Sequence, residues 1–132
     1  MEITVNEQAQ RFYLAFDKWK PAIGHEITVG KYRFCAIPLK ENVNVSEVTS
    51  GTKIFNIPMN SEIVMLTESK ESSIKFLYKI GESLKRIVER TDNLDAHLDE
   101  MKKSAFERLG KMPPIENFDT DWILDDVSDV LH

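Results

Sequence analysis

An apolar seven-residue repeat runs in one register from Leu77 to Ala105, and it constrains the fold of this chain more than any other feature. Only Thr91 and Arg108 interrupt it. A period of 3.5 residues keeps one face of a helix turned towards a partner helix. The repeat therefore predicts two long helices that pack together, or one helix that pairs with its own copy. The first positions are Leu77, Leu84, Thr91, Leu98 and Ala105, and the fourth positions are Ile80, Ile87, Leu94, Met101 and Arg108.

The repeat favours one continuous helix over residues 69–110. Thr91, Asp92 and Asn93 are poor helix formers, so a helical hairpin with its turn at this point is the alternative. A turn would keep the repeat in phase only by coincidence. A continuous helix would extend about 60 Å, longer than a small domain covers alone, and we expect a coiled-coil homodimer. The residues expected to mediate self-association are Leu84, Ile87, Leu94, Leu98 and Met101.

Aromatic residues near the N-terminus indicate a second helix. Phe12, Phe16 and Trp19 recur at spacings of three and four residues, and Pro21 follows them. This spacing places the rings on one face of an amphipathic helix, and proline does not continue a helix. We therefore expect a helix over residues 9–20.

The rest of residues 1–68 has the pattern of a small antiparallel sheet. Apolar and polar residues alternate on both sides of Gly30-Lys31 and of Gly51, where glycine suits a tight turn, so two β-hairpins are expected. Ile63–Leu66 is expected to add a last short strand. The predicted fold class is α+β: a small antiparallel sheet with an N-terminal helix, then the long heptad-patterned helix and a short acidic C-terminal helix.

Residues 111–132 form a separate acidic tail in this interpretation. Gly110 suits a helix C-terminus, and Pro113-Pro114 prevents continuation. Beyond the prolines, aspartates recur every four residues, opposite an apolar stripe, which is the pattern of an amphipathic helix that binds a basic groove. The alternative is an ordinary final helix that folds back onto its own domain or its dimer mate. The residues expected to contact a partner are Phe118, Asp121, Trp122, Ile123, Asp125, Asp126 and Asp129.

The net charge of −5 is concentrated in this tail. Residues 1–60 hold seven basic and six acidic residues, and residues 61–110 hold nine and ten. Residues 111–132 hold one basic and six acidic residues. Such an asymmetry concerns partners rather than fold, and it predicts a cationic partner for the tail.

Composition indicates a soluble cytoplasmic protein without a membrane segment. The single cysteine, Cys35, cannot form a disulfide within the chain, no apolar leader opens the sequence, and the apolar runs are too short to span a bilayer. His25, His97 and Cys35 fall in unrelated elements, and no metal, cofactor or phosphate-binding motif is present in the sequence. We therefore expect no enzyme activity and neither a cofactor nor a metal.

Two functional hypotheses follow from these patterns. The first is a small dimeric inhibitor or adaptor whose acidic tail occupies a basic site on a partner protein, including a site that would otherwise hold nucleic acid. The alternative is a single-stranded nucleic-acid-binding protein with a regulatory acidic tail, because basic and aromatic residues interleave near the N-terminus. The residues of this alternative are Arg11, Phe12, Tyr13, Lys18, Trp19, Lys20, Lys31, Tyr32, Arg33 and Phe34.

Overall fold

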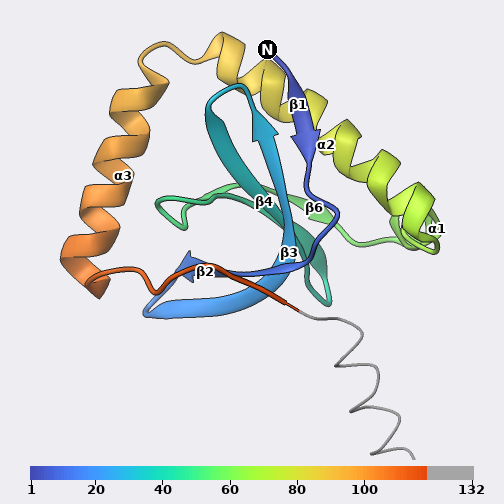
Figure 1. Ribbon diagram of the computed structural model, residues 1–132, viewed down its shortest axis with the longest axis horizontal. Coiled ribbons are helices and arrows are strands. Elements are labelled where there is room, and N and C mark those ends of the chain that lie inside the picture. Colours follow the sequence, from blue (N-terminus) through green and yellow to red (C-terminus); the bar gives the residue numbers. More distant parts are fainter. Residues whose placement is uncertain (119–132) are drawn as a thin grey trace, which may run out of the picture.

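The computed structural model describes residues 1–118, in which a seven-stranded antiparallel sheet is flanked by three helices (Figure 1). Six strands come first, the helices follow, and a short strand ends the described part. The strands are β1 (Ile3–Val5), β2 (Gln10–Ala15), β3 (Trp19–Val29), β4 (Tyr32–Pro38), β5 (Asn42–Glu47), β6 (Lys53–Pro58) and β7 (Glu116–Asn117). The helices are α1 (Ser61–Leu66), α2 (Lys70–Arg90) and α3 (Leu94–Leu109).

Strand β3 joins two parts of the sheet. Its first half pairs with β2, and its second half pairs with β4 and with β1. The strand order is β6-β5-β4-β3-β2-β7, with β1 also on β3. Gly24 lies where the pairing changes, and a Cβ atom there would stand 2.2 Å from the carbonyl oxygen of Ala36. This close approach accompanies the curve of β3 in Figure 1, which carries β2 over one face of the sheet.

The curved sheet has a core on each face. The larger core lies between the sheet and α2, and the smaller one lies where β2 packs over β4. Both faces of β4 are therefore covered, and its residues 34–37 are all buried. The larger core includes Ile27, Val29, Phe34, Val45, Ile80 and Leu84, and the smaller core contains Phe12, Leu14, Cys35, Ile37 and Val48.

Helix α2 follows the cap residue Ser69, whose hydroxyl accepts a hydrogen bond from the Ser72 backbone N–H at 3.1 Å. Its apolar face packs on the sheet rather than on another helix. Gly81 lies at the closest approach, because a Cβ atom there would be 2.5 Å from Ile3 Cγ2. The first half of the heptad repeat therefore describes the contact between α2 and the sheet.

The predicted helix over residues 9–20 is wrong, since this segment forms β2 and the start of β3. Phe12 and Leu14 are buried while the residues beside them are less so, which is the alternation of a strand. The backbone groups of β2 pair with residues 19–24, which follow at once in the chain. Aromatic spacing alone did not reveal this partner, and strand pairing outweighed the helical pattern.

The predicted continuous helix is also wrong. Helix α2 ends at Arg90, and α3 begins at Leu94 after a turn in which Asn93 has a left-handed φ of 57°. The Thr91 hydroxyl donates to the Ile87 carbonyl at 2.6 Å and closes the last turn of α2. Figure 1 shows α3 turning away from α2 along another side of the sheet, so the two helices form neither a coiled-coil stretch nor a helical hairpin. Two separate buried faces share one seven-residue phase by coincidence.

Two smaller expectations have opposite outcomes. The strand expected at Ile63–Leu66 is wrong, because Asn60 caps a helix there and its side chain accepts from the Ile63 N–H at 2.9 Å. Both predicted hairpins are present, with φ of 59° at Gly30 and 68° at Gly51. The expected acidic C-terminal helix lies outside the described residues, apart from the β7 strand at its approach.

Candidate nucleic-acid interface

The C-terminal end of α3 meets the turn between β2 and β3. Helix α3 ends at Leu109 and is capped by Gly110, whose carbonyl accepts a hydrogen bond from the Trp19 indole at 3.2 Å. Arg108 Nη1 donates to the Phe16 carbonyl at 2.6 Å. These two bonds hold segments 16–20 and 102–111 side by side, as the lower left of Figure 1 shows.

Aromatic rings and cations alternate across this junction. The rings of Trp19 and Phe106 meet edge to face with centroids 5.6 Å apart. Lys20 Nζ lies 5.3 Å from the Phe16 ring centroid, and Lys102 Nζ lies 5.6 Å from that of Phe106. Phe16 is 42% exposed, so its ring faces solvent despite its size. We call the set Phe16, Trp19, Lys20, Lys102, Phe106 and Arg108 the turn–helix cluster.

The turn–helix cluster has an excess of positive charge. Segments 16–20 and 102–111 hold six basic residues against Asp17 and Glu107. All six are exposed, and none takes part in a salt bridge within residues 1–118. Cations next to exposed rings are the combination that holds the phosphates and the bases of single strands. The six basic residues are Lys18, Lys20, Lys102, Lys103, Arg108 and Lys111.

A groove of about 390 Å³ continues from the cluster between α3 and the start of β6. Lys53, His97 and Arg108 line it together with one acid, Glu100. Met101, 40% exposed, adds an apolar surface. The groove therefore extends the surface of the cluster along α3, and Lys53 and Glu100 balance one another in charge.

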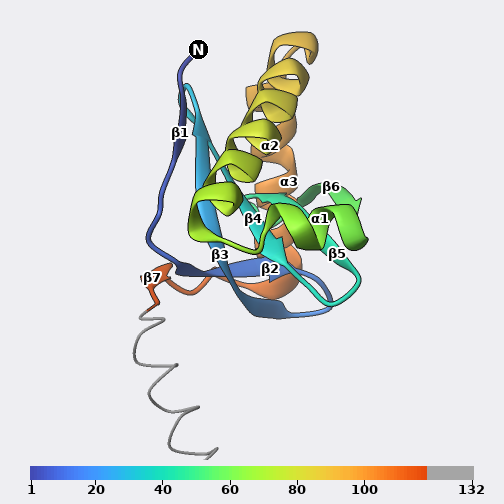
Figure 2. The same ribbon diagram turned by 90° about the vertical axis from the view of Figure 1, so that its right-hand side faces the viewer.

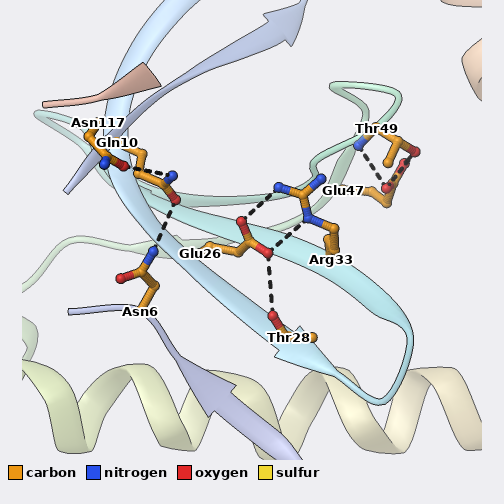
Figure 3. Close-up of polar contacts among 8 residues, drawn as sticks. All are labelled: Asn6, Gln10, Glu26, Thr28, Arg33, Glu47, Thr49 and Asn117. Carbon is orange, nitrogen blue, oxygen red and sulfur yellow. Dashed lines mark hydrogen bonds and ion pairs between the residues drawn. The ribbon is translucent and has the colours of Figure 1, made fainter. Parts of the chain in front are cut away.

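The β3–β4 hairpin, in contrast, has its charges neutralised. Lys31 Nζ lies 2.6 Å from an Asp95 carboxylate oxygen. The hydrogen bonds from Lys31 and then Tyr32 lower the pKa of Asp95, and the bond to Asp95 raises the pKa of Lys31. Arg33 binds Glu26 through two bonds of 2.9 Å (Figure 3), and this pairing raises the pKa of Arg33. Lys31 and Arg33, which belong to the residues of the nucleic-acid hypothesis, are thus paired with acids.

The ten residues of the nucleic-acid hypothesis do not form one surface, and Tyr13 is half-buried on β2. Phe12 and Phe34 are buried in the two cores, where no ligand reaches them. The charges of Lys31 and Arg33 are paired with acids. Of the ten residues, only Trp19 and Lys20 belong to the turn–helix cluster. Arg11 stands apart, 5.7 Å from the Phe118 ring centroid. The sequence-based set does not include Lys102, Phe106, Arg108 and Lys111, and Arg108 entered the sequence pattern only as an interruption of the heptad repeat.

The residues predicted for self-association lie in different surroundings. Leu84 lies on the inner face of α2 and is fully buried, and Leu98 is buried on α3. Ile87 and Leu94 are half-buried, whereas Met101 is exposed in the groove. They do not form one continuous seam. Of the predicted partner-binding residues only Phe118 is described, and Asp121, Trp122, Ile123, Asp125, Asp126 and Asp129 lie outside the described residues.

Cys35 lies in the smaller core, where burial raises the pKa of its thiol to about 12. Its thiolate fraction at neutral pH is then about a thousandfold below that of a free cysteine. We expect iodoacetamide to label it only after denaturation, as mass spectrometry of native and urea-unfolded protein can show. Rapid labelling of the native protein would contradict the burial. Within residues 1–118 no three potential metal ligands lie close enough together to hold an ion.

Comparisons with models of known protein families, with curated proteins and with solved structures find no match for this chain. None of the three described helices has the length and apolar character needed to cross a membrane.

Proposed function

We propose that this protein binds single-stranded nucleic acid through the turn–helix cluster and the adjoining groove. The observation that carries the proposal is the contact between aromatic rings, of which Phe16 is exposed and Phe106 half-buried, and cations that have no acidic partner among residues 1–118. Stacking on rings requires bases that are not already stacked in a duplex, which favours single strands. Cations beside the rings would bind the backbone phosphates.

Two roles are expected within the cluster. Phe16 is the ring most open to solvent and is the expected stacking surface. Lys20 and Lys102 each lie over a ring and are the expected phosphate contacts. Trp19 and Arg108 also hold α3 to the β2–β3 turn, so their replacement would change the geometry as well as the contacts.

Fluorescence anisotropy with a labelled oligothymidylate tests these roles. Phe16→Ala is expected to weaken binding by about 1–3 kcal/mol, the range for loss of one stacked base. Lys20→Gln and Lys102→Gln should each lower the slope of log affinity against log salt by about 0.7, the value for one phosphate contact on a single strand. Lys79→Gln, an exposed lysine on α2, is the matched control and should change neither quantity. Equal effects of Lys79→Gln and Lys20→Gln, or no measurable binding, would refute the proposal.

The hypothesis of a dimeric inhibitor or adaptor stays a prediction. Its partner-binding residues lie outside the described part of the chain, apart from Phe118. A cationic surface on this protein favours an anionic ligand, whereas that hypothesis requires a basic partner for the tail.

A further inference from the structure

An apolar cavity of about 320 Å³ lies between the sheet and the start of α2. It shares no residue with the turn–helix cluster or with the groove beside that cluster, so it is a separate feature of the molecule. Its inner wall consists of buried side chains of the larger core, which come from β4, β5 and α2. These side chains are Ala36, Val43, Phe76 and Leu77.

The cavity opens at the link between α1 and α2. Pro38 at the end of β4 and Thr67 in the link both line the cavity, and both are exposed. Figure 2 shows this link and the first turn of α2 in front of β4. The opening therefore gives a small molecule access to the buried inner wall.

The wall of the cavity is uncharged. No Asp, Glu, Lys or Arg lines it among the residues that the structure describes. A charged group that entered such surroundings would lose its hydration and gain no opposite charge, which costs free energy. Charge complementarity therefore favours a neutral and mainly apolar ligand.

Two polar side chains of the wall are free to bond a ligand. His25 Nδ1 lies 3.0 Å from the Asn6 carbonyl. A carbonyl only accepts, so Nδ1 carries the hydrogen and Nε2 of the neutral ring is an acceptor. Within residues 1–118, neither His25 Nε2 nor the Ser73 hydroxyl has a hydrogen-bond partner, whereas the Thr67 hydroxyl donates to the Ile63 carbonyl at 3.0 Å. The wall thus suits a ligand with one N–H or O–H donor.

The volume limits the size of the ligand. An apolar cavity of about 150 Å³ holds one benzene ring. The cavity described here has about twice that volume, which suits two fused rings. We propose that it binds a neutral bicyclic aromatic molecule of the indole class, with the rings against Phe76 and Leu77 and the N–H donating to His25 Nε2. Contact with the Phe76 ring adds to the burial of apolar surface.

NMR titration of the methyl-labelled full chain with indole tests the proposal. We expect saturable shifts of the Val43 and Leu77 methyl signals, with no shift of Val48, which lies in the smaller core. Indene has the shape of indole but no N–H. His25→Leu should therefore lower the ratio of indole affinity to indene affinity by about two- to tenfold, the effect of one hydrogen bond.

Variants that fill the cavity provide a second test. Ser73→Phe narrows it from α2 and should abolish the methyl shifts with indole. Ser83→Phe, ten residues further along the same helix, is the matched control and should leave binding intact. Ala36→Leu fills the cavity from β4 and should have the same effect as Ser73→Phe, so it replaces that variant if the latter does not fold.

Four results would overturn the proposal. Absence of saturable shifts with indole would show that the cavity does not bind this class of molecule. Equal shifts of Val43, Leu77 and Val48 would show binding without a defined site. Shifts that persist in a folded Ser73→Phe or Ala36→Leu variant would place the ligand elsewhere. An unchanged ratio of the two affinities in His25→Leu would refute the hydrogen bond to Nε2.

Discussion

Leu84→Ala is expected to lower the free energy of unfolding by about 2–5 kcal/mol, because it removes a fully buried side chain between α2 and the sheet and leaves a cavity. Met101→Ala should change it by less than about 0.5 kcal/mol, because Met101 is 40% exposed on α3. Both residues belong to the same apolar repeat. Urea denaturation gives the two values, provided that the dependence on urea concentration is unchanged between variants.

The same experiment tests whether the repeat is a coiled-coil seam. A seam would make the two losses similar and would make the unfolding midpoint depend on protein concentration. That outcome would contradict the separate packing of α2 and α3 described here.

Gly24→Ala is expected to destabilise the fold by about 1–3 kcal/mol or more, because the new methyl group would meet the Ala36 carbonyl oxygen at 2.2 Å. Both atoms of this clash belong to or adjoin paired backbone, so neither moves without disturbing β3 or β4. Thermal unfolding followed by circular dichroism measures the loss.

Gly81→Ala provides the comparison for the Gly24 variant. Its methyl group would also be too close to a neighbour, at 2.5 Å, but that neighbour is a side-chain atom of Ile3. Alanine also gains about 1 kcal/mol over glycine inside a helix. We therefore expect a smaller loss at Gly81, and equal tolerance at both positions would argue against the close packing of β3 on β4.

Local signals predicted several elements correctly. Gly30 and Gly51 mark the two hairpin turns, Ser69 marks the start of α2, and Gly110 marks the end of α3. Each of these residues has a backbone or capping requirement that few other residues satisfy. The errors concern the helix at Ser61–Leu66, which Asn60 caps, and segments whose structure depends on what pairs with them or packs against them.

Two errors have specific physical causes. Phe12 lies on a strand because β3 follows directly and supplies its hydrogen bonds, which residue spacing does not reveal. The heptad repeat disfavours a turn at Asn93. Helices α2 and α3 nevertheless pack against different surfaces and need no shared register. An apolar period therefore does not show what covers a helix face, and one residue of the same repeat, Met101, is 40% exposed.

The candidate site was predictable only in part. The basic and aromatic residues near Trp19 are visible in the sequence, but their partner Phe106 lies far along the chain. Pairing of Lys31 with Asp95, 64 residues away, removes the hairpin from the site and has no local signal. Which cations remain without an acidic partner therefore depends on contacts between residues far apart in the sequence.

We propose above that the turn–helix cluster binds single-stranded nucleic acid. NMR titration of ¹⁵N-labelled protein with an oligothymidylate tests it most directly, because the Trp19 indole N–H reports on its bond to the Gly110 carbonyl. We expect salt-sensitive shifts of this signal and of residues 102–111, with residues 31–33 unchanged. Shifts confined to residues 31–33, or none at all, would contradict the account.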